Sequence, residues 1–196
     1  MKTSLELKSE RVYLRSLNRH DIIPLRDAIL ESVDTVGVWQ DWCHPEFTET
    51  DARVWVSNSR QNWSTDSRYE LGIYDNDTHE LIGALCVYSI DRVANLGNLG
   101  YWVKTKHQRK GIAFEAGQMM IRFTFEKLNI TRLEIVIDPN NQPSRRIAEK
   151  LGAQLECLAR NRLIFKDHVK DGLLYSLIPS DLKARNKNKT NTKTDS

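Results

Sequence analysis

The stretch Gln108-Arg109-Lys110-Gly111-Ile112-Ala113 decides the fold, because it connects a strand-like run at residues 99–103 with a helix-like run at residues 114–127. Backbone N–H groups at a helix start lack intrahelical partners, and the helix dipole adds partial positive charge. Together with Lys106, Arg109 and Lys110, these groups predict a site for an anion, above all a phosphate. The glycine spacing fits neither a nucleoside-triphosphate P-loop nor a dinucleotide fingerprint.

A second motif, Asn141-Gln142-Pro143-Ser144, begins 30 residues after Gly111 and is followed by Glu149-Lys150-Leu151-Gly152-Ala153. The distance is about the span of a helix, a strand and a turn. Both helix starts are therefore expected at the C-terminal edge of neighbouring strands, where open α/β sheets bind ligands. Taken alone, Asn141 is most simply explained as a helix N-cap, with Ser144 as a polar residue of the first turn. Their position opposite a phosphate loop at a parallel strand pair favours a ligand site instead.

Length and composition predict one globular domain with no membrane span. The chain has 196 residues, of which 40% are apolar and 28% charged, and no run of about 18 apolar residues occurs. Its first residues lack the apolar core of a signal peptide. Three cysteines are scattered singly, which favours a reducing compartment and a cytoplasmic location. The five histidines show no ligand spacing, so we expect no metal site.

The net charge of +3 comes from the end of the chain. Residues 183–196 carry five basic residues against Asp195, a net charge of +4, which leaves −1 for residues 1–182. We therefore expect one domain at residues 1–182 and a disordered basic tail at residues 183–196. A nearly neutral body argues against a nucleic-acid surface, and a nucleic-acid partner rests on the tail alone.

The hydrophobic pattern predicts a mixed α/β sheet covered by helices on both faces. Helices are expected from Asn18 or Asp21 to about Ser32, from a cap at Thr48 to about Trp63, at residues 114–127, and from Pro143 to Leu151. A turn is expected from Lys166 to Gly172. Antiparallel hairpins are expected first and last, with a βαβ crossover in the middle. The strands are expected at residues 11–15, 69–74, 81–89, 98–104, 132–137, 155–165 and 173–178.

The two motifs in this order resemble the GNAT superfamily of acetyl-CoA-dependent N-acetyltransferases. Within it, the chain is most similar to the RimJ/RimL type, which acetylates N-terminal amines of ribosomal proteins. The similarity covers roughly residues 7 to 180 and includes Arg11-Val12-Tyr13-Leu14-Arg15, Trp39-Gln40-Asp41-Trp42, Leu81-Ile82-Gly83, Leu99-Gly100-Tyr101-Trp102 and Tyr175-Ser176-Leu177-Ile178. It implies a single, mostly antiparallel sheet of about seven strands with a central splayed parallel pair.

The resemblance also implies where acetyl-CoA binds. The pantetheine arm would lie between the splayed strands around residues 99–104 and 132–137, paired with backbone groups near Trp102, Val103 and Lys104. Asn141 would hydrogen-bond the pantetheine, and Arg145 or Arg146 could reach the adenosine phosphates. The pyrophosphate would be held by the loop that starts at Gln108 and by its N–H groups at Arg109, Lys110, Gly111, Ile112 and Ala113.

The implied reaction is direct transfer of acetyl from the thioester to a primary amine. The N–H of Val103, at a strand bulge, would stabilise the thioester carbonyl, and Ser144 would donate a proton to the sulfur. Relatives often place a carboxylate in the strand after Ala153, but this chain reads Arg160-Asn161-Arg162-Leu163. Glu70, or a water chain ending at backbone carbonyls or at His168, would replace that base.

Three aromatic residues are candidates for the wall of the acceptor groove, namely Trp39, Trp42 and Tyr101, although packing in the core explains them equally well. The acceptor is expected to be a protein N-terminus, because no acidic cluster suited to a polyamine occurs beyond Glu70 and Asp91. A small amine such as a polyamine or an aminoglycoside, and a non-catalytic CoA-binding sensor, stay open as alternatives. The chain is expected to be a monomer or a homodimer.

Overall fold

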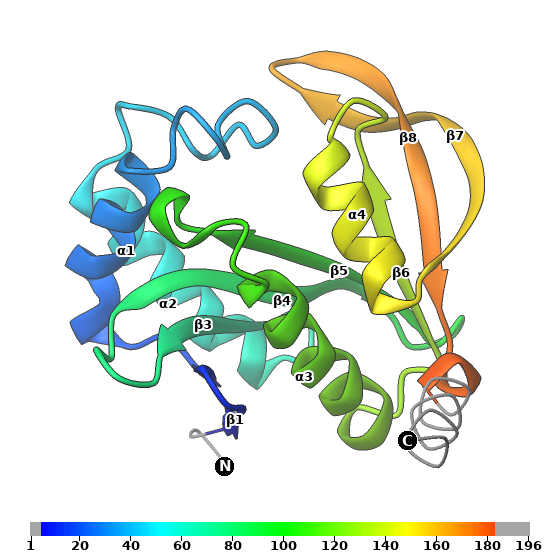
Figure 1. Cartoon of the computed structure of the whole chain (residues 1–196), viewed down its shortest axis with the longest axis horizontal. Coiled ribbons are helices and arrows are strands. Elements are labelled where there is room, and N and C mark those ends of the chain that lie inside the picture. Colours follow the sequence, from blue (N-terminus) through cyan, green and yellow to red (C-terminus); the bar gives the residue numbers. More distant parts are fainter. Residues whose placement is uncertain (1–4, 183–196) are drawn as a thin grey trace, which may run out of the picture.

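The computed structural model describes residues 5–182, which form one eight-stranded sheet with helices on both faces (Figure 1). The helices are α1 (Ile22–Leu30), α2 (Glu49–Ser64), α3 (Ile112–Lys127) and α4 (Gln142–Leu151), with short 3-10 turns at Arg19–Asp21 and Thr105–His107. The strands are β1 (Glu6–Lys8), β2 (Val12–Arg15), β3 (Tyr69–Asp75), β4 (Leu81–Asp91), β5 (Leu96–Val103), β6 (Arg132–Ile137), β7 (Gln154–Phe165) and β8 (His168–Leu177).

The strand order is β1-β2-β3-β4-β5-β6-β8-β7, and β5–β6 is the parallel pair while the other neighbours are antiparallel. This confirms the predicted fold class. The short strand β1 adds an eighth strand to the seven that the pattern predicts, because three residues with mixed charge carry little periodicity.

The helices pack in pairs on opposite faces, so alternate residues of the central strands enter two different hydrophobic cores. Leu71 and Ile73 of β3 pack in one core with Met120 of α3. Tyr74, whose side chain points the other way, packs in the second core with Leu25 of α1. Burial on both faces explains why the first eight residues of β4, Leu81 to Tyr88, contain no charged side chain.

The residues that the sequence predicts to cap helices do so at the start of α2 and at the end of α4. At the start of α2, the Asp51 N–H donates to Thr48 Oγ1 at 3.2 Å, and the Thr48 N–H donates to Asp51 Oδ2 at 2.8 Å. This reciprocal capping box satisfies two otherwise unpaired donors. Gly152 ends α4 with a φ of 93°, a left-handed conformation that favours glycine.

Strands β5 and β6 pair only at one end, and this creates the gap that the resemblance implies. Their ladder runs from Leu96↔Arg132 to Asn98↔Glu134 and then stops. Beyond it, β6 continues to pair with β8 through Ile137↔Leu173, while β5 continues to pair with β4. The open edges of the two strands therefore face each other without hydrogen bonds between them.

The β7–β8 hairpin turns earlier than the sequence predicts. Its turn is Lys166-Asp167, with φ values of 49° and 60°, and β8 already begins at His168. The prediction of a turn from Lys166 to Gly172 was wrong because this part of β8 is mostly polar and contains Gly172, so its sequence lacks strand-like alternation. At the tip, the Lys166 N–H donates to both carboxylate oxygens of Asp41, at 3.0 and 2.9 Å.

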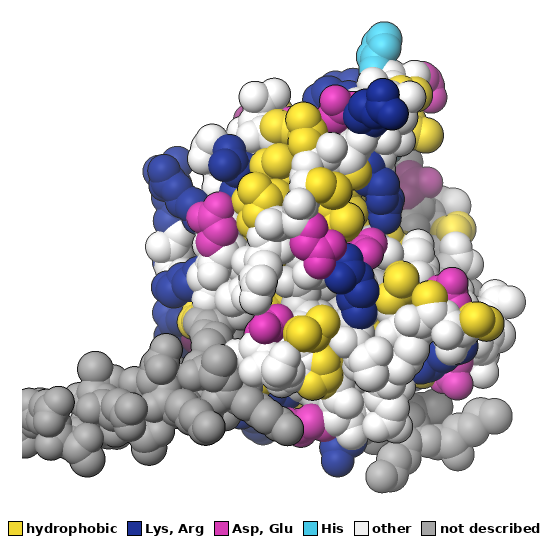
Figure 2. Space-filling model, turned by 90° about the vertical axis from the view of Figure 1, so that its right-hand side faces the viewer, with side chains coloured by type: hydrophobic (Ala, Val, Ile, Leu, Met, Phe, Trp, Pro, Cys, Tyr) yellow, Lys and Arg dark blue, Asp and Glu magenta, His cyan; other side chains and the backbone are white. Residues whose placement is uncertain are grey.

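Strand β7 is the edge of the sheet and carries several exposed apolar side chains. Leu155, Leu158 and Ile164 are 52%, 53% and 72% exposed, and Val169 of β8 is exposed beside them. Figure 2, which faces this side of the molecule, shows hydrophobic side chains gathered in one area with charged side chains around it.

No helix within residues 5–182 is long and apolar enough to cross a membrane. The predicted disordered tail at residues 183–196 lies outside the described residues, so it stays a prediction.

Candidate active site

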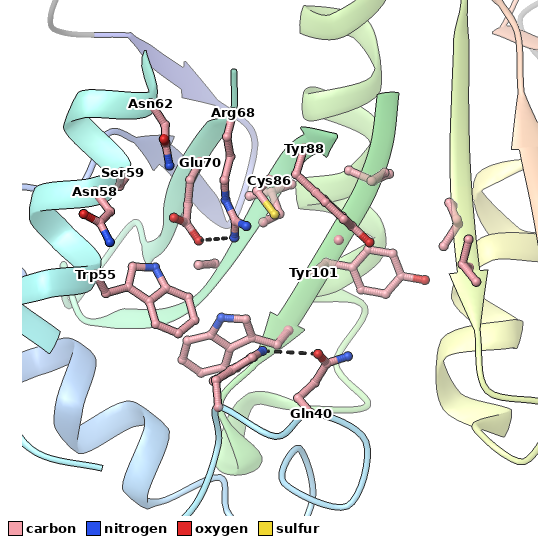
Figure 3. A pocket seen from close by; sticks show the side chains of 18 of the residues that line it. Gln40, Trp55, Asn58, Ser59, Asn62, Arg68, Glu70, Cys86, Tyr88 and Tyr101 are labelled. Carbon is pink, nitrogen blue, oxygen red and sulfur yellow. Dashed lines mark hydrogen bonds and ion pairs between the residues drawn. The ribbon is translucent and has the colours of Figure 1, made fainter. Parts of the chain in front are cut away.

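A cavity of about 640 Å³ opens where β5 and β6 separate, and it extends across the sheet toward α2. Tyr101 of β5, Val136 of β6 and Ser144 of α4 form the wall beside the gap. Residues of α2 and β3 form the opposite wall, and Figure 3 shows their side chains facing Tyr101 across the space. The cavity thus connects the splayed strands with an acceptor-sized groove.

The loop before α3 has the backbone geometry of an anion site. Arg109 and Gly111 adopt φ values of 60° and 81°. Within residues 5–182, no acceptor is found for the backbone N–H groups of residues 109–113. These donors stand at the start of a 16-residue helix, where the dipole also favours an anion. A Cβ on Gly111 would lie 3.3 Å from Arg11 Nη2.

Arg11 holds this loop from the start of β2. Its Nη1 donates to Lys110 O at 2.6 Å, and its Nε donates to Glu115 Oε2 at 2.8 Å. Burial raises the pKa of Glu115, but hydrogen bonds from Ser9 and Arg11 outweigh it and hold the pKa below its usual value. Arg11 thereby offsets the one carboxylate in the first turn of α3, which would otherwise repel an anion.

Gln108 and Lys104 support the loop from within the protein. Gln108 Nε2 donates to Val103 O at 2.9 Å and to Thr35 Oγ1 at 3.0 Å, so the side-chain amide braces the loop. The Lys104 side chain bonds Glu80 at 2.7 Å. The Lys104 backbone N–H donates to β4, so Lys104 has no free backbone donor for the predicted pantetheine pairing.

Val103 presents a free N–H to the gap, although the predicted bulge is absent. The ladder between β4 and β5 is regular from Gly83↔Val103 to Tyr88↔Asn98. Because the Lys104 N–H bonds Ile82 O in β4, the N–H groups of Val103 and Tyr101 point the opposite way, toward β6. The prediction of a bulge was wrong: the donor is free because β6 has moved away, not because β5 is distorted.

Ser144 lies in the first turn of α4 and is tied to β5. Its Oγ is 3.1 Å from the Tyr101 hydroxyl, which also donates to Ser144 O at 3.1 Å. Burial raises the pKa of Tyr101 to about 12, so this phenol stays protonated. Asn141 Oδ1 accepts from the Ser144 N–H at 3.1 Å, which makes Asn141 the N-cap of α4.

The remaining predicted cofactor residues lie around the two helix starts. Arg145 Nη1 donates to Pro139 O at 3.2 Å, and Arg146 is exposed on α4. Arg109 and Lys110 are exposed. The Ile112 side chain is buried in the core and Ala113 packs against it, so these two residues offer only their backbone N–H groups.

Glu70 lies in the cavity wall on β3, with 4% of its surface exposed. Its Oε1 accepts from Arg68 Nη2 at 3.1 Å. Burial raises the pKa of Glu70, and the Arg68 guanidinium and the Trp55 indole oppose that shift. No hydrogen bond to Oε2 is found within residues 5–182, so this oxygen can accept from a ligand.

The predicted aromatic wall is partly assembled. Trp42 and Tyr101 line the cavity, and the Trp42 ring lies between the rings of Trp55 and Trp102, with centroids 4.9 and 5.5 Å away. Trp39 is not among the lining residues. The repeated tryptophan of the motif therefore contributes one ring to the wall and not two.

The stretch Arg160-Asn161-Arg162-Leu163 lies in β7 and brings Arg162 to the strand gap. Arg162 Nη2 lies 3.4 Å from Asn98 Oδ1 and 3.7 Å from Glu134 Oε2, at the point where β5 and β6 part. His168 pairs with Phe165 at the hairpin tip and does not line the cavity. His168 is thus no terminus for a water chain in this cavity.

Residues 11–154 match the acetyltransferase (GNAT) domain family. The match spans more than half of the chain and contains the splayed strands and both helix starts. The chain belongs to this family. As a GNAT protein it is an N-acetyltransferase, an acyltransferase.

Known proteins similar to this GNAT chain include ribosomal-protein acetyltransferases. A solved structure titled "Structure of a putative ribosomal-protein-serine acetyltransferase from Vibrio cholerae" is 34% identical, covers 91% of this chain and 100% of its own, and has a TM-score of 0.82. The [Ribosomal protein uS5]-alanine N-acetyltransferase of Escherichia coli (strain K12) is 26% identical over 90% of this chain and 92% of its own length.

The fold is shared with more distant acetyltransferases. RimL, a ribosomal L7/L12 alpha-N-protein acetyltransferase solved in complex with coenzyme A, is 19% identical and has a TM-score of 0.82. It covers 89% of this chain and 98% of its own. At this identity the likeness concerns the fold alone.

Several cavity residues of this GNAT chain were missed by sequence reasoning. Asn58 and Asn62 line the cavity from α2, one helical turn apart, and Arg68 lines it from the residue just before β3. Polar side chains on a surface helix are usually solvated, so their spacing alone gave no signal. A clue was available in Arg68, because it lies two residues before Glu70, the spacing at which side chains of an extended chain point to the same side.

Proposed function

We propose that the chain transfers an acetyl group from acetyl-CoA to the α-amine of a protein N-terminus, with a ribosomal protein in the cytoplasm as the acceptor class. The observation that carries this proposal is the cavity that joins the splayed strands to a long groove with few free carboxylates. Glu70 is paired with Arg68, and Asp51 caps α2. A polyamine would need several unpaired carboxylates, so the groove favours a peptide.

The residues around the gap fit acetyl-CoA. Five backbone N–H groups at residues 109–113 suit its pyrophosphate, and the open edge of β5 suits the amide groups of pantetheine. Arg145 and Arg146 lie where the adenosine phosphates would be reached. The thioester supplies the activated acetyl group, and the described residues supply its orientation.

The geometry supports direct attack by the amine on the thioester carbonyl. The Val103 N–H faces the gap and would donate to the carbonyl oxygen as negative charge develops there. The C–S bond breaks as the new C–N bond forms, and Ser144 Oγ, in contact with Tyr101, would give the leaving sulfur its proton. The attacking amine loses one proton to Glu70 or to water, and solvent returns one proton to Ser144, so the amine and the thioester yield an amide and a thiol with no net change in protons.

The pKa of the acceptor explains why this chain works without the carboxylate that relatives often carry. An α-amine has a pKa near 8, so about a tenth is already neutral at pH 7. A lysine or polyamine amine has a pKa near 10.4, so at pH 7 only about one molecule in 2,500 is neutral, and the reaction needs a general base. The arginine at position 162 therefore supports an α-amine acceptor.

A screen with acetyl-CoA and intact-mass detection tests the proposal. The acceptors are peptides that carry ribosomal-protein N-termini, the same peptides with blocked N-termini and one free lysine, spermidine, and an aminoglycoside. We expect one added acetyl group on the free α-amine only. Acetylation of spermidine or the aminoglycoside alone would overturn the protein acceptor. Binding of CoA without any acetylation would indicate a CoA sensor.

A further inference from the structure

The wall of the cavity opposite the strand gap has an excess of hydrogen-bond donors without partners. Within residues 5–182, the buried Trp102 Nε1 and Arg68 Nε make no hydrogen bond, and Trp55 Nε1 lies close enough to Glu70 to lower its pKa but makes no hydrogen bond of normal geometry. All three residues line the cavity. Buried N–H groups are nearly always paired in folded proteins. Three unpaired donors around one cavity indicate a ligand that brings acceptors.

The acceptors on the same wall are already engaged. Glu70 Oε1 accepts from Arg68, Gln40 Oε1 accepts from the Trp42 indole at 3.2 Å, and Asp51 Oδ2 accepts from Thr48. Asp51 Oδ1 and Asn58 Oδ1 belong to exposed residues, whereas Glu70 is buried, so Glu70 Oε2 is the buried carboxylate oxygen without a hydrogen bond within the described residues. One buried acceptor beside several buried donors matches one amine followed by several carbonyl groups.

Helix α2 extends this donor surface away from the strand gap. Asn58 makes no side-chain hydrogen bond within the described residues, and Asn62 uses only its Oδ1, which accepts from Ser67. Figure 3 shows both amide nitrogens on the cavity side of α2. The lining residues run from Asp51 to Asn62, which is about 16 Å of helix. An extended peptide covers that distance with about five residues.

From this arrangement we infer that the groove along α2 is a peptide subsite that reads main-chain carbonyl oxygens of the acceptor. Trp55 and Arg68 donate to the carbonyls nearest the α-amine, and Asn58 and Asn62 donate to those further along. The subsite selects an extended, neutral main chain. It disfavours a polyamine, whose N–H groups would meet other N–H groups without an acceptor between them. This inference rests on the proposed function.

Backbone-modified acceptors test the subsite. The acceptor is a five-residue peptide with N-terminal Ala, Ser or Met, whichever the wild-type protein acetylates fastest. Three versions of this peptide differ only in the bond between the first and second residues. The first has a normal peptide bond, the second has an ester that keeps the carbonyl group, and the third has a trans alkene that lacks it. We expect the ester to match the amide within about threefold in kcat/KM, and the alkene to lose about tenfold or more.

The variant Trp55→Phe keeps an aromatic ring and removes the N–H. It should lower kcat/KM about tenfold for the amide and the ester but leave the alkene unchanged, because the alkene has already lost the carbonyl. An equal loss on all three acceptors would overturn the assignment of Trp55 and indicate a packing role. Equal wild-type kcat/KM for amide and alkene would overturn the subsite while the acetyltransferase activity stands.

A length series tests the groove along α2. In the Asn58→Leu/Asn62→Leu variant, KM for the five-residue peptide should rise about tenfold with kcat little changed, and a dipeptide amide should be unaffected. Gln61→Leu, on an exposed position of the same helix that does not line the cavity, is the matched control. A rise in KM that is the same for both lengths, or that Gln61→Leu reproduces, would overturn the role of the two asparagines.

Discussion

Ser144 and Tyr101 form the contact that links α4 to the open strand edge. The two hydroxyl oxygens lie 3.1 Å apart, and the phenol also donates to the Ser144 carbonyl. A serine placed only to start the helix would not need this partner, since Asn141 already caps α4. The contact therefore fixes the position of the Ser144 hydroxyl in the cavity wall beside the strand gap.

Replacement of Ser144 by Ala should lower kcat by about 10-fold to 1,000-fold and leave the affinity for acetyl-CoA nearly unchanged. A proton donor that acts in the transition state affects the rate more than binding. Steady-state kinetics and thermal melting on one preparation separate the two roles. A lower melting temperature with unchanged kcat would assign Ser144 to helix stability alone.

Glu70→Gln should reduce kcat by no more than about tenfold. Burial raises the pKa of Glu70, so the carboxyl takes up its proton at a higher pH than an exposed one and is then unable to accept another. If the acceptor α-amine limits the reaction, the rate should rise with pH around a midpoint near 8 as that amine loses its proton.

The pH profile of the Glu70→Gln variant should keep this midpoint. A loss of a thousandfold or more, together with a changed midpoint and intact acetyl-CoA binding, would identify Glu70 as the base. The α-amine argument would then be wrong.

At the scale of elements, the loop and helix α3 act together as the anion site. Gly111 precedes the helix in a left-handed conformation, and this directs five N–H groups outward. The sequence predicts this element well, because small residues and the strand-to-helix change are local signals. It does not predict that Gln108 braces the loop, since the partners Thr35 and Val103 are brought there by tertiary structure.

Gly111→Val should weaken CoA binding by about 2–4 kcal/mol if two charge-assisted hydrogen bonds are lost. Isothermal calorimetry measures the change. Gly111→Ala is the matched control: it shares the strain of a positive φ but lacks the bulk that would block the pyrophosphate. Unchanged affinity in a folded Gly111→Val protein would contradict the assignment of this loop.

Two elements mark the limit of sequence reasoning. The hairpin β7–β8 was misplaced because its polar residues look like a turn, and the bulge at Val103 was inferred from relatives and is absent. In both places the deciding interaction is non-local: β8 pairs with β6 and β7, and β6 leaves β5 at Glu134. Local periodicity carries no information about such partners.

At the scale of the whole molecule, fold class, order of elements and the edge that holds the site all follow from the two motifs. The acceptor side could not be predicted in the same way. Asn58 and Trp55 come from α2 and Arg68 directly precedes β3, and ordinary polar or aromatic patterning explains each of them alone. They become a site only when the sheet places α2 opposite the splayed strands (Figure 3).

The bonds from Arg11 to Lys110 O and Glu115 tie the first strands of the sheet to the anion loop. Thermodynamic linkage then couples coenzyme binding to the local unfolding of β2. Saturating CoA should slow hydrogen exchange of the amides in β2, as measured by mass spectrometry. Arg11→Ala should remove this protection, whereas Arg26→Ala, whose partner is Asp27 within α1, should keep it. Equal protection in both variants would show that the coupling does not run through Arg11, and no protection of β2 in the wild-type protein would show that the two regions open independently.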